Sequence, residues 1–191
     1  MERLLIKRKI KTIDEKSMIV AAKENPERFR PLYELHYEEI FHFINKKIGE
    51  KEISADISAE VFYKALINLK QYQITKTPFI AWLYRIAINE TTAFFRNSKK
   101  EQLVVLDDFQ IHYLQSELKY RNLEEEDMRF YLSSAFQKLK PLEVEIIELR
   151  FYEDKSFKEV GEILEMTENN AKVKTYRILD KLKYILKNIN F

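Results

Sequence analysis

The chain has 191 residues, of which 46% are hydrophobic and 34% charged, and its formal net charge is only +2. This balance is typical of a soluble globular protein and excludes a disordered one. Two glycines and four prolines disfavour a fold rich in strands and turns and predict an all-α protein. The absence of cysteine excludes disulfides and thiolate chemistry, and no apolar run is long enough for a signal peptide or membrane insertion. We therefore expect a cytoplasmic protein.

The first half of the chain predicts a helical bundle behind a basic extension. Residues 1–17 are basic, and apolar residues then recur at helical spacing. Gly49 is suited to end the first long helix, and Pro78 to begin the last, because proline is tolerated at the first helical position. Helices are predicted over residues 29–48, 55–69 and 78–96, with a loop at 70–77. We expect one domain over residues 18–100, with Trp82 in its core.

An acidic segment separates this bundle from the rest of the chain. From Glu101 to Asp127 there are eight acidic and two basic residues, and the helical period is weak. We interpret residues 101–127 as an acidic linker and residues 128–191 as a second small helical domain. Its first helices are predicted over 130–139 and from Pro141, the second with Leu142, Ile146 and Leu149 inward.

A short helix, a tight turn and a long basic helix follow one another after Ser156. Ser156 and Glu159 form a capping box, in which each side chain accepts the backbone N–H of the other residue. A turn is predicted at Glu165–Met166, and Thr167 is suited to cap the last helix. The apolar side of that helix consists of Ala171, Thr175, Ile178, Leu182 and Ile185. This order predicts a helix-turn-helix.

The polar side of the last helix carries residues suited to DNA. The first turns of a recognition helix meet base edges in the major groove, where asparagine pairs with adenine and lysine with guanine. Basic residues further along suit phosphates. We predict base contacts by Asn169, Asn170, Lys172 and Lys174, and phosphate contacts by Arg177 and Lys181. The alternative is an ordinary lysine-rich surface helix.

The segment 68–77, which includes the predicted loop, is a second candidate site for nucleic acid. Asn68, Lys70 and Tyr72 combine an amide, a cation and a ring, and stacking on a ring contributes roughly 1–3 kcal/mol per unpaired base. The alternative is that Tyr72 is a rim aromatic of the bundle. No catalytic constellation, phosphate-binding glycine loop or metal-binding histidine spacing is found in the sequence. We therefore predict a protein that is not an enzyme and has no cofactor or metal.

Two sets of motifs resemble those of bacterial RNA polymerase sigma factors of the extracytoplasmic-function (ECF) type, in the sigma-70 family. P-F-I-A-W-L-Y-R-I-A-I-N at 78–89 is similar to their signature helix, and D-I-S-A-E-V-F at 56–62 to their D-x-x-Q-E-x-F segment. The family's second conserved domain is matched by L-K-P at 139–141, the Ser156 box, K-V-K at 172–174 and Arg177. The resemblance extends from about Met18 to Leu186.

The resemblance implies that the protein binds core RNA polymerase and directs promoter recognition and melting in transcription initiation. The first domain would bind the clamp helices of the large subunit and melt the −10 element. The second would read the −35 element, with the polymerase flap as a further contact. Polymerase contacts are implied for Asp56, Ile57 and Glu60. Contacts with −10 DNA are implied for Asn68, Lys70, Tyr72, Arg85, Asn89 and Arg96, and contacts with −35 DNA for Asn169, Asn170, Lys172, Lys174, Arg177 and Lys181.

The chain departs from the family pattern at three positions that bear on promoter recognition, one of which is Ala93, where an aspartate is common. Ala59 replaces the usual glutamine and removes an amide from the polymerase or promoter face. Glu165 stands at a turn position usually held by glycine, which implies strain if its φ is positive. An anti-sigma factor is a further partner to consider, and these departures add another DNA-bound recruiting factor.

Two other functions are alternatives. A helix-turn-helix transcriptional regulator would use a separate signal-receiving N-terminal domain, which would have no reason to carry the helix at 78–89. A nuclease or recombinase would cleave DNA with a metal held by acidic residues.

Overall fold

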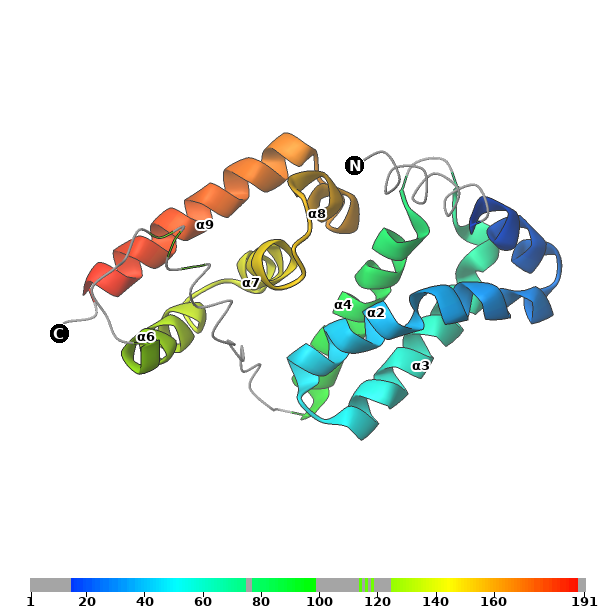
Figure 1. Cartoon of the computed structure of the whole chain (residues 1–191), viewed down its shortest axis with the longest axis horizontal. Coiled ribbons are helices and arrows are strands. Elements are labelled where there is room, and N and C mark those ends of the chain that lie inside the picture. The colour runs from blue at the N-terminus through cyan, green and yellow to red at the C-terminus, as the bar shows by residue number, and fades with distance from the viewer. Residues whose placement is uncertain are drawn as a thin grey trace. The chain divides into compact units, whose positions relative to one another are not determined.

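Helices account for all the regular secondary structure in the described part of the chain, which confirms the all-α prediction (Figure 1). The computed structural model describes residues 15–74, 77–98, 114, 116, 118 and 125–188. The chain divides into two compact units, residues 1–100 and 101–191. Most of the predicted basic extension and nearly all of the predicted linker lie outside the described residues. No described helix combines the length and apolar character needed to cross a membrane.

The first described element of the N-terminal unit is a helix over residues 15–24. Its further elements are the 3-10 helix η1 (Pro26–Phe29), α2 (Arg30–Ile48), α3 (Lys51–Asn68), the 3-10 helix η2 (Leu69–Gln71) and α4 (Phe79–Ser98). Helices α2, α3 and α4 pack on one another in all three pairs. Their apolar faces form the core, because removing these side chains from water is the main favourable term in folding. Core residues include Leu32, Ile40, Ile44, Val61 and Leu83.

Local signals explain where some of these helices begin and end. The Asn25 side chain accepts the backbone N–H of Glu27 at 3.0 Å and caps η1. Gly49, with a φ of 77°, ends α2 as predicted and donates its N–H to the carbonyl of Asn45 at 2.8 Å. Helix α3 begins at Lys51, earlier than the predicted residue 55. No signal in the sequence marks this start, because the N-cap residue Glu50 makes no side-chain capping hydrogen bond.

The C-terminal unit is organised around its last helix. Its elements are α6 (Glu125–Phe136), α7 (Pro141–Ile147), the π-helix η3 (Glu148–Tyr152), α8 (Phe157–Ile163) and α9 (Glu168–Asn188). Helix α9 packs against α6, α7 and α8. The core of this unit includes Leu132, Ile146, Leu149, Val160 and Leu182.

Two predictions for this unit are corrected. Helix α6 begins at Glu125, earlier than residue 130. Leu142 is 46% exposed instead of inward. Because Val144 to Leu149 are all buried, a 3.6-residue period does not identify which side of this short helix faces the core. Pro141 does lie in the first turn of α7, as predicted.

Candidate nucleic-acid interface

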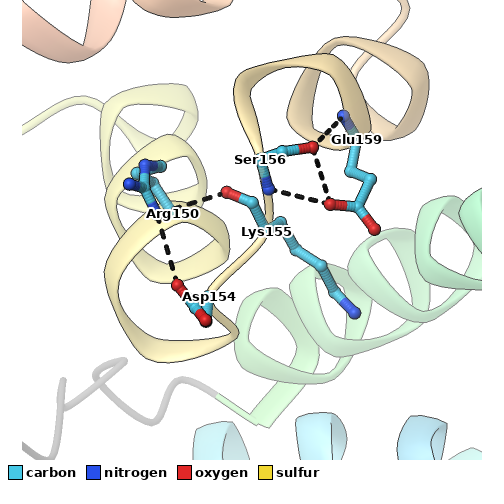
Figure 2. A network of polar contacts seen from close by, with 5 residues as sticks. All are labelled: Arg150, Asp154, Lys155, Ser156 and Glu159. Atoms are coloured by element: carbon cyan, nitrogen blue, oxygen red, sulfur yellow. Dashed lines mark hydrogen bonds and ion pairs between the residues drawn. The ribbon is translucent and has the colours of Figure 1, made fainter. Parts of the chain in front are cut away.

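Capping contacts hold the two helices of the helix-turn-helix at their first turns. The backbone N–H of Ser156 donates to Oε2 of Glu159 at 2.8 Å, and the N–H of Glu159 donates to Oγ of Ser156 at 3.2 Å (Figure 2). At the start of α9, Oγ1 of Thr167 accepts the N–H of Asn170 at 3.2 Å. Both caps confirm the sequence predictions.

Arg150 connects the π-helix to the segment that leads into α8. Its guanidinium makes long hydrogen bonds, both 3.5 Å, to the carboxylate of Asp154 and the carbonyl oxygen of Lys155 (Figure 2). It also lies 5.3 Å from the ring centre of Phe157, the first residue of α8. Sequence reasoning missed this residue, because nothing local distinguishes it from a surface arginine.

The turn between α8 and α9 is closed tightly against α8. Glu165 has a φ of 55°, a left-handed conformation that costs a non-glycine residue roughly 1–2 kcal/mol. The backbone N–H of Met166 donates to the carbonyl of Gly161 at 2.9 Å. A Cβ atom at Gly161 would lie only 2.7 Å from the carbonyl oxygen of Met166. Glycine at 161, rather than at 165, is therefore what this turn requires sterically.

Helix α9 presents a polar face opposite to its buried side. Ala171, Thr175, Ile178 and Leu182 are buried as predicted, and Lys174 is half-buried. The opposite, exposed face consists of Asn169, Asn170, Lys172, Val173, Tyr176 and Arg177.

Two apolar side chains lie on this exposed face of α9. Val173 is 37% exposed and Tyr176 is 48% exposed. Tyr176 was not among the predicted contacts. Apolar groups on a recognition helix can contact the methyl group of thymine.

Lys181 takes part in a structural ion pair. Its Nζ lies 2.6 Å from Oε2 of Glu143, which ties α9 to α7. Burial acts to raise the pKa of the Glu143 carboxyl, but the hydrogen bonds from Lys181 and from the backbone N–H of Lys140 outweigh it, so the pKa is lowered. The phosphate contact predicted for Lys181 would have to compete with this pair, and we omit it from the proposed interface.

A cavity of about 410 Å³ lies in the N-terminal unit, where α3, η2 and α4 meet. Its lining consists of Lys64, Asn68, Gln71, Tyr72, Trp82, Ile86, Asn89 and Glu90. The cavity thus brings together three of the residues implied for −10 DNA: Asn68, Tyr72 and Asn89. The other three do not line it; Lys70 and Arg96 are exposed and Arg85 is half-buried.

Tyr72 forms part of the cavity wall. It is only 8% exposed, and its ring stacks on Trp82 with centres 4.9 Å apart and 27° between the planes. The ring also meets Phe79 edge-on at 5.3 Å. Its hydroxyl donates to the carbonyl of Thr77 at 2.5 Å. Burial raises the pKa of Tyr72 to about 12, so the phenol keeps the proton that it donates.

This stacked pair changes two expectations. Trp82 is half-buried and lines the cavity, so the prediction that it lies in the core is wrong. Tyr72 is not an exposed platform, because one face of its ring is covered by Trp82. A base in the cavity would meet the pair together, rather than the free ring that the sequence suggested.

An ion pair adds charge to the cavity wall. Nζ of Lys64 lies 2.7 Å from Oε2 of Glu90 on α4 and 3.4 Å from Oε1 of Glu60 on its own helix. Sequence reasoning assigned no role to Lys64 or Glu90. Their pairing joins two helices and carries no local sequence signal.

The exposed side of α3 combines acidic and apolar residues. Asp56 and Glu60 are exposed one turn apart, and Ile57 is half-buried. Further along the same side, Tyr63 is 57% exposed and Ile67 is 56% exposed. Exposed apolar side chains that lie together indicate a protein-binding surface. The sequence prediction included the acidic residues and missed the two apolar ones.

Family comparisons match both units. The model "Sigma-70 region 2" matches residues 32–101, and "Sigma-70, region 4" matches residues 135–184, which together are more than half of the chain. The chain belongs to the sigma-70 family of RNA polymerase sigma factors. Its region 2 match contains α3 and the cavity, and its region 4 match contains the helix-turn-helix.

The sigma factor is similar to ECF proteins over most of its length. It is 23% identical to the ECF RNA polymerase sigma factor SigW of Bacillus subtilis (strain 168). The alignment is 197 residues long with its gaps and covers 97% of this chain and 99% of SigW. It is 23% identical to the ECF sigma factor SigM of the same organism, over 80% of this chain and 91% of SigM.

Solved structures share the fold of this sigma factor. CnrH, in complex with the cytosolic domain of CnrY, superposes with a TM-score of 0.57 at 18% identity, over 91% of this chain and 97% of CnrH. RpoE of Bartonella quintana, in complex with the anti-sigma factor NepR, gives a TM-score of 0.50 at 16% identity, over 85% of this chain and 98% of RpoE. These structures show the fold alone. The two sigma-70 matches and the similarity to SigW identify the chain as an ECF-type sigma factor, a non-enzymatic family whose members direct promoter recognition by RNA polymerase.

Proposed function

We propose that this sigma factor contacts promoter DNA through each of its two units. Residues 18–100 act on the −10 element, residues 128–191 bind the −35 element, and residues 101–127 are the linker between them. The observation that carries the proposal is that each unit has a candidate surface for one form of DNA. The cavity of the first suits an unpaired base, and the exposed face of α9 suits a duplex.

The cavity supports a role in promoter melting. Its volume, about 410 Å³, falls within the roughly 300–1,000 Å³ typical of ligand pockets. Asn68 and Asn89 supply amide donors and acceptors, and the Tyr72–Trp82 pair supplies an aromatic wall. Flipping a base out of a duplex costs a few kcal/mol, and stacking and hydrogen bonds of this kind offset that cost. A flipped base of the non-template strand is the proposed occupant.

Helix α9 supports reading of the −35 duplex in the major groove. Asn169, Asn170, Lys172 and Lys174 lie in its first turns, where a recognition helix meets base edges. Arg177 is exposed one turn beyond Val173, in a position suited to a phosphate. Neutralising phosphates releases counterions, so this contact is expected to weaken as salt rises.

The exposed side of α3 is the proposed contact with the clamp helices of the polymerase large subunit. Asp56 and Glu60 supply negative charge, while Ile57, Tyr63 and Ile67 supply apolar area. Charge complementarity with a basic partner would favour fast and specific docking. We further propose that the C-terminal unit contacts the polymerase flap.

Regulation by a protein partner and a cytoplasmic location are also proposed. The similar protein RpoE was solved with the anti-sigma factor NepR, and an anti-sigma factor is a proposed partner of this chain.

Ala59 is exposed on α3 and offers no side-chain amide to polymerase or promoter. Assistance by another DNA-bound recruiting factor would compensate for that loss.

Replacing both Lys174 and Arg177 by alanine is expected to weaken −35 duplex binding at least about tenfold. Loss of the Arg177 phosphate contact should also reduce the slope of log K against log salt by about 1. Fluorescence anisotropy of the full chain at several salt concentrations measures both, with a duplex selected by the wild-type chain from a random library. Lys183→Ala with Lys187→Ala removes two charges further along α9 and should have a smaller effect. Equal loss of DNA and polymerase binding would contradict this assignment and indicate misfolding.

A further inference from the structure

The helix over residues 15–24 reaches the loop that borders the cavity. It packs onto the unit through Ile19 and Ala22, which are 1% and 2% exposed. Lys23 extends from this helix, and its Nζ donates to the carbonyl oxygen of Tyr72 at 2.5 Å, across 49 positions of sequence. The same ammonium lies 6.0 Å from the centre of the Tyr72 ring.

The carbonyl of Tyr72 needs such a donor. Tyr72 follows η2 with extended backbone angles, φ −64° and ψ 130°, and so stands outside a helical hydrogen-bond ladder. A carbonyl beside a buried ring costs free energy unless it is paired. A charged donor makes a stronger hydrogen bond than a neutral one. Lys23 therefore fixes the backbone at the residue whose ring forms the cavity wall.

A second polar contact lies at the other end of the helix. Oε1 of Glu15 is 2.7 Å from Nε2 of His36 on α2. The His36 ring is in turn 5.7 Å from the ring of Phe79, the first residue of α4. The helix thus contacts Tyr72 directly and reaches Phe79 through His36, and these two residues bracket the loop.

We propose that Lys23 is a positioning residue for promoter melting. It holds the Tyr72 backbone, and through the Tyr72–Trp82 stack it sets the shape of the base-binding cavity. The inference rests on the proposed function of that cavity. It adds a residue on the helix over 15–24, whereas the implied −10 contacts lie on α3, on η2 and just after it, and on α4.

Trp82 provides a reporter for this test, since the chain contains one tryptophan. In Lys23→Met, Trp82 of the isolated full chain should become more accessible to acrylamide, because Tyr72 is no longer held against it. Lys23→Arg keeps a charged donor and should restore most of the protection. Lys16→Met is the matched control, because it removes the same charge from an exposed position of the same helix.

Promoter melting is the second readout. With core polymerase and a promoter recovered by transcription of genomic DNA, Lys23→Met should slow opening about tenfold, as expected from loss of a charged hydrogen bond. A 2-aminopurine in the −10 non-template strand follows opening. Polymerase binding and −35 duplex binding should stay unchanged, because Ile19 and Ala22 still dock the helix.

The outcomes separate this inference from the proposed function. Unchanged acrylamide quenching in Lys23→Met overturns the positioning role of Lys23, whatever happens to melting. An equal change in Lys16→Met overturns it as well, because the effect would then be one of charge alone. If acrylamide quenching increases in Lys23→Met but promoter melting is unchanged, Lys23 does hold the Tyr72 backbone. In that case the proposed role of the cavity in promoter melting is overturned.

Discussion

Gly161→Ala is expected to destabilise the C-terminal unit by about 1–3 kcal/mol, although the same change usually favours a helix. In a helix interior alanine is more favourable than glycine by roughly 1 kcal/mol. At this position, however, the added Cβ would lie 2.7 Å from the oxygen of Met166 and 3.3 Å from the nitrogen of Glu168. Both are backbone atoms, so the turn between α8 and α9 must open. The steric term therefore outweighs helix propensity.

Urea denaturation of the full chain, followed by circular dichroism, measures this loss for the C-terminal unit. Binding of a −35 duplex should fall with it, because the turn sets how α9 is presented. Lys158→Ala, at an exposed position of the same helix, should change stability by no more than about 0.5 kcal/mol. If Gly161→Ala were as stable as the wild type and bound DNA equally well, the close approach of α8 and the turn would be refuted.

Reversing the charge of Asp56 and Glu60 together is expected to abolish co-elution with core RNA polymerase. Both carboxylates are exposed on α3, so arginine is accommodated without disturbing the core. Like charges placed across an interface cost several kcal/mol, which corresponds to a loss of about 100-fold or more in affinity. Glu60 also lies 3.4 Å from Lys64, so part of its field is already screened, and Asp56→Arg alone should have the larger single effect.

Size-exclusion chromatography with core polymerase measures this loss. Glu24→Arg with Glu27→Arg is the matched control, since it reverses two exposed charges of the same unit away from α3. The control should still co-elute. Co-elution of the Asp56→Arg, Glu60→Arg variant at wild-type levels would remove this face of α3 from the polymerase interface.

The parts of the fold that the sequence predicted correctly are those that short-range chemistry decides. Ser156 with Glu159, Thr167 and Gly49 each act within a few residues, so their effects are visible in the sequence. The start of α3, which has no side-chain cap, and the π-helix after Ile147 have no such signal. Leu142 was placed inward because the buried stretch from Val144 to Leu149 includes Glu145 and Glu148, so the spacing of apolar residues does not show which side of the helix faces the core.

The candidate site was predictable only in part, because its geometry depends on pairs that are distant in sequence. Lys64 with Glu90, Lys23 with Tyr72 and Lys181 with Glu143 are such pairs. A long charged side chain has many potential partners, and tertiary packing decides among them. For this reason the sequence suggested a phosphate contact for Lys181. It did not predict the ion pair of Lys181 with Glu143 or the stacking of Tyr72 on Trp82.

The most direct test of the central claim is transcription in vitro by core RNA polymerase on a genomic DNA library, with and without the full chain. We expect the chain to cause initiation at a limited set of sites, which share one sequence element near −10 and another near −35. Core polymerase alone should not use these sites. Identical start sites in the presence and absence of the chain would show that it does not direct promoter recognition.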